Sequence, residues 1–116
     1  MIRDDKVYLK HILDSIRFIE KHCNKITMSV FIRDKLLQNA MVRLLEIIGE
    51  AAKLISKDTK SKLSGVQWNK IIAMRNTLTH EYFGVDLKIV WSTIHEELPK
   101  LKKEITAHLK FLRPTS

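Results

Sequence analysis

Residues 36–55 decide the fold, and they read LLQNAMVRLLEIIGEAAKLI. Apolar side chains recur in this stretch at alternating spacings of four and three residues, at Leu37, Met41, Leu44, Ile48, Ala51 and Ile55. That spacing places them along one side of an α-helix, as a buried helical face requires. The stripe is widened by four further apolar positions, Leu36, Ala40, Ile47 and Leu54. So wide a stripe indicates more than one neighbouring helix and leaves room for one from another subunit.

The helix that carries this stripe is predicted to begin near Thr27 or Ser29, whose hydroxyl groups suit an N-cap, and to run to about Ser56. Gly49 costs about 1 kcal/mol inside a helix relative to alanine, so its presence indicates a close approach of another helix. Asp34 lies near the phase of the stripe, and we expect it to cap a helix or face solvent. The stretch also holds Arg43, Glu46 and Glu50 at ordinary spacings for ion pairs within one helix.

Three more helical segments flank this one. Residues 4–23 predict a first helix with a buried face, which consists of Tyr8, Ile12, Ile16, Ile19 and Cys23. Residues 57–65 form a polar connection, and a third helix follows from about position 67 or 68 to 84, where a glycine suits its end. Asp86 then caps a fourth segment. The apolar residues of this segment keep the same helical spacing before and after Pro99, as far as Leu112, and His108 falls in the same series. This predicts a kinked helix or two nearly collinear ones.

Composition agrees with a helical, soluble protein. The 116 residues are 45% hydrophobic and 29% charged, and they contain only three glycines and two prolines, which favours long helices over many short strands. We expect residues 1–116 to form a single all-α domain, an antiparallel bundle of four to five helices. The single cysteine, the lack of a long apolar run and the absence of a signal-like start predict a cytoplasmic protein. The net charge of +8 would help to hold a polyanion.

One short polar segment carries candidate chemistry: residues 75–82 read RNTLTHEY. An arginine can stabilise a pentacovalent phosphate, and a histidine can move a proton near neutral pH. Arg75 and His80 are therefore the pair of side chains that a metal-free ribonuclease needs. A plainer interpretation also fits, because arginine and histidine near a helix C-terminus interact well with the negative end of the helix dipole.

Helical geometry constrains how these residues act together. On an intact helix, residues five apart lie about 140° around the axis, so Arg75 and His80 do not share a face. His80 instead aligns with Asn76, and Arg75 aligns with Thr79 and Tyr82. Two such helices that face each other across a two-fold axis would line one cleft with both sets of side chains. The spacing therefore predicts a site shared by two chains.

The sequence resembles the HEPN-domain toxins of the HepT type. Three features carry the resemblance: the Arg75-x4-His80-x-Tyr82 motif, preceded by residues 68–74 (WNKIIAM); the segment 48–52 (IGEAA); and the segment 86–98 with Trp91. It extends from the first helix to Leu112, and no key position of the motif departs from the pattern. It implies a HEPN-like helical fold.

The resemblance also implies a function. Such proteins are metal-independent endoribonucleases that act as toxins in type VII toxin–antitoxin pairs, with RNA as substrate and no cofactor or metal. On this basis Arg75 and His80 are catalytic, with a 2′,3′-cyclic phosphate as the expected product end, and Asn76 supports the site. The implied partners are a second copy in a homodimer and a minimal nucleotidyltransferase of the MNT type. That antitoxin would neutralise the toxin by transferring AMP units onto Tyr82.

Two other functions remain open at this stage. The bundle could be a non-catalytic scaffold that docks a nucleotidyltransferase and helps to bind its nucleotide. It could also be a basic protein that binds RNA or DNA without cutting it, in which case binding would depend on salt but not on His80. Toxicity of the chain expressed alone separates the ribonuclease from the scaffold.

Overall fold

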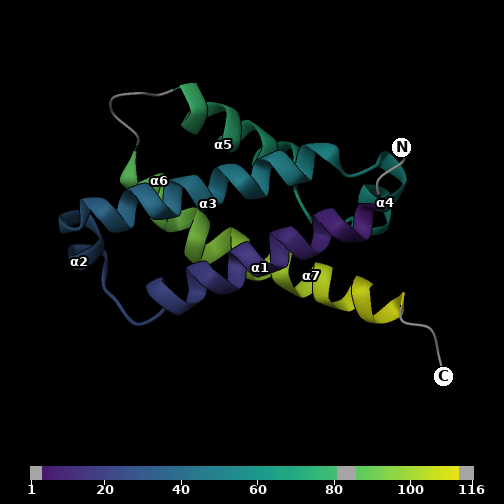
Figure 1. Cartoon of the computed structure of the whole chain (residues 1–116), viewed down its shortest axis with the longest axis horizontal. Coiled ribbons are helices and arrows are strands. Elements are labelled where there is room, and N and C mark those ends of the chain that lie inside the picture. Colours follow the sequence, from purple (N-terminus) through teal and green to yellow (C-terminus); the bar gives the residue numbers. More distant parts are fainter. Residues whose placement is uncertain (1–3, 81–85, 113–116) are drawn as a thin grey trace.

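The computed structural model describes residues 4–80 and 86–112, apart from the side chains of Thr79 and His80 (Figure 1). Every regular element in these residues is helical, and none of the helices is long and apolar enough to cross a membrane. In chain order they are α1 (Asp5–Cys23), α2 (Met28–Arg33), α3 (Lys35–Leu54), α4 (Lys57–Lys62), α5 (Trp68–His80), α6 (Leu87–Ser92), the π-helical turn η1 (Thr93–Glu97) and α7 (Leu98–Phe111). The predicted all-α bundle is confirmed: α1, α3, α5 and the run α6–η1–α7 are its rods, with α2 and α4 at their ends.

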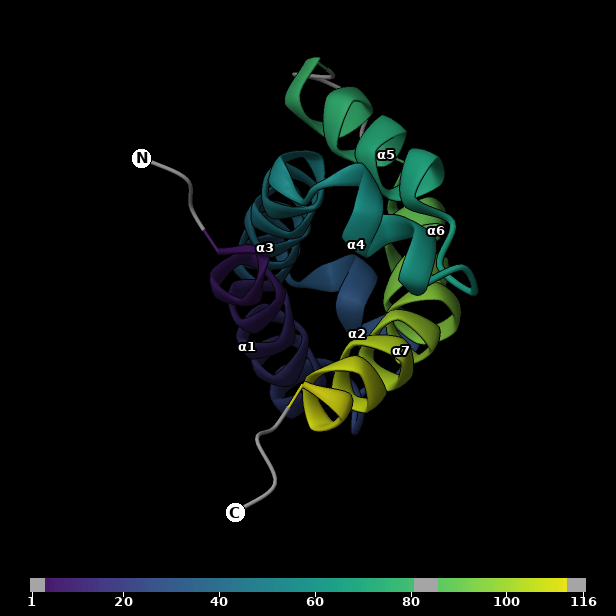
Figure 2. The same cartoon turned by 90° about the vertical axis from the view of Figure 1, so that its right-hand side faces the viewer.

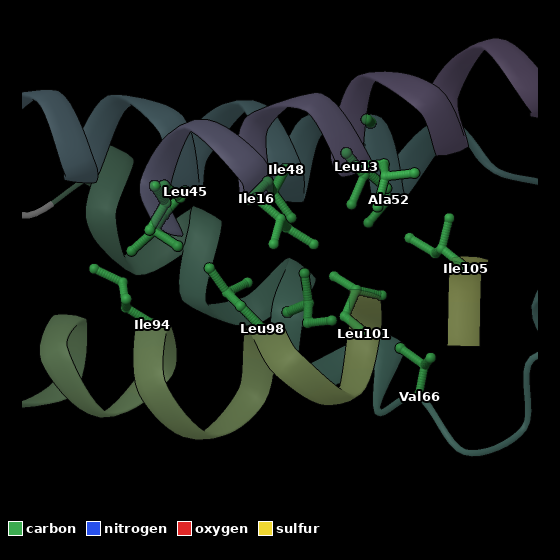
Figure 3. Packing of buried hydrophobic residues seen from close by; sticks show 14 of the residues in the cluster. Leu13, Ile16, Leu45, Ile48, Ala52, Val66, Ile94, Leu98, Leu101 and Ile105 are labelled. Carbon is green, nitrogen blue, oxygen red and sulfur yellow. The ribbon is translucent and has the colours of Figure 1, made fainter. Parts of the chain in front are cut away.

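The helix α3 holds the bundle together, because it packs against α5 on one side and α1 on the other (Figure 2). In turn, α1 packs against α7, which closes the core. Figure 3 shows side chains of α1, α3 and the α6–η1–α7 run converging on this core, among them Ile16, Ile48, Ile94, Leu98 and Leu101. The bundle buries only part of the predicted stripe on α3, since Met41, Ile48 and Ala51 are buried, whereas the widening positions Leu36 and Leu54 are exposed.

The first helix forms as the sequence predicts. Asp4 caps its N-terminus by accepting a hydrogen bond from the backbone N–H of Lys6 at 2.9 Å, and Asn24 is its C-cap. The predicted face is buried in full, at Tyr8, Ile12, Ile16, Ile19 and Cys23. Apolar side chains at spacings of three and four residues therefore gave a reliable prediction here.

The prediction of one helix from residue 27 or 29 to about 56 is wrong, because the chain breaks at Asp34. That residue is extended, with φ −110° and ψ 92°, and its Oδ1 accepts from the N–H of Leu37 at 3.0 Å to cap α3. The side-chain amide of Gln38 donates to the carbonyl oxygens of Phe31 and Ile32, both at 2.8 Å, so α2 ends with hydrogen-bonded carbonyls. A carboxylate and an amide at these positions replace the helical bonds that the break removes, and the expected capping role of Asp34 is confirmed.

The predicted polar connection, residues 57–65, contains the short helix α4, which the sequence did not predict. Ser56 is its N-cap and accepts from the N–H of Thr59 at 3.2 Å. The carboxylate of Asp5 accepts from the N–H and hydroxyl of Ser56 and from the hydroxyl of Thr59, at 3.1, 2.5 and 2.6 Å. These bonds tie the start of α1 to the start of α4. These bonds hold α4 in place, since α4 has no buried side chain that could do so.

The run from α6 to α7 confirms the predicted continuity through Pro99. Asp86 caps α6 by accepting from the N–H of Lys88 at 2.9 Å. Proline has no N–H to donate to the preceding turn, and the helix widens into the π-helical turn η1 just before Pro99. The buried face stays continuous, at Val90, Ile94, Leu98, Leu101 and Ile105. It does not extend to Leu112, which is 40% exposed.

Candidate active site

The helix α5 presents the candidate residues along the edge where it packs on α3. Trp68, Ile71 and Leu78 are buried on its inner face, whereas Asn76 is exposed. Arg75 lies between these two faces, and its side chain is 21% exposed. The arginine is therefore half-buried against α3 at an accessible edge of the bundle.

Gly49 makes the close approach of α5 to α3 possible. A methyl group on Gly49 would lie 2.1 Å from Cβ and 2.7 Å from Cγ of Arg75, which is closer than carbon atoms can pack. The predicted close helix–helix contact at Gly49 is confirmed, and the residue in contact is the candidate catalytic arginine. Because Gly49 has no side chain, the aliphatic part of Arg75 lies directly on α3.

Glu50 fixes the head of the same arginine. Its Oε2 accepts from Nε of Arg75 at 3.0 Å and from Nη2 at 2.5 Å, and Nη1 of Arg75 donates to Oδ1 of Asn76 at 2.8 Å. Among the described residues, these three bonds leave two N–H groups of the guanidinium without a partner. Gly49, Glu50, Arg75 and Asn76 together form what we call the Arg75 site.

The sequence interpretation of Glu50 was wrong. Its spacing from Arg43 and Glu46 suggests an ion pair within one helix, whereas its carboxylate pairs with Arg75 on the neighbouring helix. Side chains 25 residues apart in sequence give no periodic signal. The signal that could have found the pair is the position of Glu50 directly after the glycine of the close contact.

The other predicted site residues are placed less fully. His80 is the last residue of α5, which is continuous from Trp68, so positions 75 and 80 lie about 140° apart around one helix axis. The side chain of His80 and all of Tyr82 lie outside the described residues. The structure thus brings together Arg75 and Asn76, and it supports the premise of an intact helix from which a two-chain site was predicted.

A cavity of about 330 Å³ lies on the other side of α5, between it and α6–η1. Its lining is mostly apolar, with Ile71, Met74 and Leu78 from α5 and Ile89 from α6. Arg75 and Asn76 do not line it. The polar chemistry is therefore at the α3–α5 edge and not in this cavity.

Comparison with known proteins agrees with this site. Residues 12–107 match the model of a family described as "Ribonuclease HepT-like". No solved structure matches the chain. The matched range contains the whole Arg75 site together with His80 and Tyr82.

Individual relatives cover most of the chain. "Putative RNase TTE0752" from Caldanaerobacter subterraneus subsp. tengcongensis is 42% identical over 104 residues, which are 90% of this chain and 93% of the relative. "Probable ribonuclease HepT" from Thermococcus cleftensis is 42% identical over 102 residues, 88% of this chain and 93% of the relative. "Gamma-glutamylcyclotransferase and putative RNase MJ0434" from Methanocaldococcus jannaschii is 42% identical over 105 residues, 90% of this chain but 47% of the relative. By family model and by these relatives, the chain belongs to the HepT-like ribonuclease family.

Proposed function

We propose that this protein is a metal-independent endoribonuclease and the toxin of a type VII toxin–antitoxin pair. The observation that carries the proposal is the fixed guanidinium of Arg75. Its stem lies on Gly49, and its head is held by Glu50 and Asn76, which leaves two N–H groups without a partner in the described part of the chain. The side chain of an arginine held this way is already ordered, so binding a phosphate costs little further side-chain entropy. Membership of the HepT-like ribonuclease family supports RNA as the source of that phosphate.

In the proposed reaction, the ribose 2′-oxygen attacks the adjacent phosphorus, and the bond from phosphorus to the 5′-oxygen breaks. One proton leaves the 2′-hydroxyl, and one reaches the departing 5′-oxygen. His80 moves one of these protons, as base or as acid, a role for which imidazole suits neutral pH. Arg75 stabilises the negative charge that develops on the phosphate oxygens. The products are a 2′,3′-cyclic phosphate and a free 5′-hydroxyl.

A homodimer would complete the site. Positions 75 and 80 point to different sides of α5, so one helix does not bring them to one phosphate. The surface next to Glu50 supports a second copy, because α3 exposes apolar side chains there along one stripe. Leu36 is 82% exposed and Leu54 is 54% exposed, and Ile47 lies between them at the same helical phase. Such a stripe on a helix is the face that a symmetric dimer buries.

Control of the toxin would act at Tyr82, two residues beyond His80. A minimal nucleotidyltransferase of the MNT type would transfer AMP from ATP to the tyrosine hydroxyl, with release of pyrophosphate. Each added AMP brings a negative phosphate close to Arg75 and blocks RNA by occlusion and repulsion. The substitution Tyr82→Phe should leave RNA cleavage intact and abolish AMP transfer, measured as intact mass after incubation with the partner and ATP. An AMP adduct on this variant would assign the acceptor to another residue.

The ribonuclease is tested directly by incubating the purified chain with RNA, with and without EDTA. We expect new RNA ends that carry a 2′,3′-cyclic phosphate, at a rate that EDTA leaves unchanged, and arrest of growth when the chain is expressed alone. Loss of cleavage on chelation would replace this mechanism with a metal-dependent one. A chain that neither cuts RNA nor arrests growth, yet binds a nucleotidyltransferase, would be the non-catalytic scaffold.

A further inference from the structure

A second positively charged region lies between α1 and α7. It is a groove of about 360 Å³ whose rim holds Lys6, Lys10 and Arg17 from α1 and Lys110 from α7. Its floor includes Leu13 and Leu109, and no acidic side chain of the described residues lines it. We call this region the α1–α7 groove.

The four cations of the groove are not neutralised within the described part of the chain. Ion pairs there involve Lys62, Lys70, Arg75 and Lys102, and none of these lines the groove. Asp5 is next to Lys6 in sequence, but its carboxylate is engaged by Ser56 and Thr59. The groove therefore concentrates part of the net charge of +8 where the described cations form no ion pair, although Asp14 stands one turn of α1 from both Lys10 and Arg17.

The spacing of these cations suits a chain of phosphates. Lys6, Lys10 and Arg17 are four and seven residues apart, so they lie along one side of α1 and span roughly 16 Å at 1.5 Å per residue. Successive phosphates of one stacked strand advance about 3.4 Å, so the row faces roughly five of them. Lys110 adds charge from the opposite wall.

We infer that the α1–α7 groove binds the phosphate backbone of RNA, independently of sequence. Lysine is a point charge that attracts phosphate without reading bases, and the groove has no aromatic lining on which bases could stack. The inference rests on RNA being the substrate of the proposed ribonuclease. At the Arg75 site the carboxylate of Glu50 offsets the charge of Arg75, so that site contributes less to affinity than to chemistry.

The groove and the Arg75 site lie on opposite sides of the bundle, as Figure 2 shows for α5 against α1 and α7. The described chain measures 48 × 29 × 24 Å. A stacked strand that runs straight from one side to the other across 29 Å covers about nine nucleotides at 3.4 Å each. An RNA of roughly that length bridges the groove and the Arg75 site, whereas a shorter RNA occupies the groove alone.

The test uses four substitutions in the groove, Lys6→Gln, Lys10→Gln, Arg17→Gln and Lys110→Gln. A matched control removes four exposed cations elsewhere by Lys25→Gln, Arg33→Gln, Lys57→Gln and Lys88→Gln. Both sets are made in the His80→Ala chain, which leaves the RNA uncut. Binding of fluorescein-labelled oligouridylates of 6 and 20 nucleotides is measured by anisotropy from 0.05 to 0.2 M salt.

For the 20-mer, the groove variant should bind about tenfold or more weakly than its parent, and its salt slope should fall by up to about three. The control should lose less than about threefold at both lengths, and the groove variant should also bind the 6-mer more weakly, because the phosphates of a 6-mer are about as many as the row faces. Equal losses in the two variants would overturn the inference, because net charge alone would explain them. Unchanged RNA binding would also overturn it, and if the same variant lost its nucleotidyltransferase the groove would be a protein interface. Because no cleavage is measured, groove binding without any ribonuclease activity of the unsubstituted chain would refute only the proposed function.

Discussion

The Arg75 site and the α1–α7 groove both present positive charge, but they hold it in different ways. Arg75 is half-buried and donates three hydrogen bonds to oxygen atoms of Glu50 and Asn76, so its guanidinium has one orientation. The groove cations lie at or near the surface and make no ion pair among the described residues. A fixed charge can stabilise a transition state, whereas free charges attract a polyanion of any sequence. The comparison predicts that substitutions in the two regions change different kinetic constants.

The largest effect is expected at Arg75 and His80, the proposed catalytic pair. Arg75→Ala and His80→Ala should each lower the rate of RNA cleavage by about 10²-fold or more, since proton transfer alone typically contributes about 10²–10⁴-fold. The rate is measured on end-labelled RNA, and circular dichroism serves as the folding control. Cleavage by the folded His80→Ala chain at the original rate would remove the histidine from the mechanism.

Glu50→Gln should distinguish the role of the Arg75 site from that of the α1–α7 groove most clearly. It keeps the size of the side chain but removes the charge that holds Arg75, and hydrogen bonds to charged groups are worth about 1.5–3 kcal/mol. We expect kcat to fall about 10- to 100-fold with little change in KM, whereas the groove substitutions should raise KM for long RNA and leave kcat unchanged.

The control for Glu50→Gln is Asp58→Asn, which removes an exposed carboxylate from α4 that pairs only with Lys62. It should change neither constant. If Glu50→Gln raised KM without lowering kcat, Glu50 would help to bind RNA and would not position the arginine.

Gly49→Ala tests the packing on which the Arg75 site depends. The added methyl group meets Cβ and Cγ of Arg75, which cannot move unless α5 shifts, and overpacking of this kind costs about 1–3 kcal/mol. We expect a lower melting temperature and slower cleavage. Gly65→Ala is the matched control, because a methyl group there meets only the flexible carboxylate end of Glu104. Equal melting temperatures for the two variants would show that α5 can move away from α3 at little cost.

The smallest effect is expected at Asp5, beside the groove. Partial burial acts to raise the pKa of Asp5, but hydrogen bonds from Ser56 and Thr59, together with nearby Lys60, outweigh it and hold the pKa below 3.8. A carboxyl group whose pKa is lower in the folded state stabilises the protein above the unfolded value and loses that contribution as the pH falls through the folded value. Asp5→Asn should therefore lower stability at neutral pH and flatten its loss below pH 3.8, measured by urea unfolding.

The Asp5→Asn variant also tests whether Asp5 offsets the charge of the α1–α7 groove. RNA binding by Asp5→Asn should not change, because the carboxylate already faces Ser56 and Thr59. Tighter binding of the 20-mer by this variant would mean that Asp5 neutralises part of the groove.

Local features of the sequence were enough to predict much of the fold. The face of α1, the cap at Asp86 and the continuity through Pro99 each depend on residues of one helix. The contact at Gly49 was indicated by the glycine alone, although its partner Arg75 lies on another helix. The break at Asp34 was missed because the apolar spacing continues across it, and only the contacts of Gln38 with α2 show where the chain turns.

The candidate site could be predicted in part. Arg75 was proposed from its chemistry and Asn76 from the family resemblance, and the structure brings these two side chains together. Glu50 was assigned to an ordinary ion pair because its partner is 25 residues away on another helix. The α1–α7 groove was not predicted either, since three of its cations come from one end of the chain and the fourth from the other.

The central claim is that Arg75 and His80 from two copies of the chain cut RNA together, and mixing two inactive variants tests it. Arg75→Ala and His80→Ala chains are unfolded together, refolded as a mixture and assayed on RNA beside each variant alone. A mixed dimer regains one complete site of two, and half of the dimers are mixed, so we predict about a quarter of the original activity. A mixture as inactive as its two parents, with the unsubstituted chain active after the same treatment, would contradict the shared site.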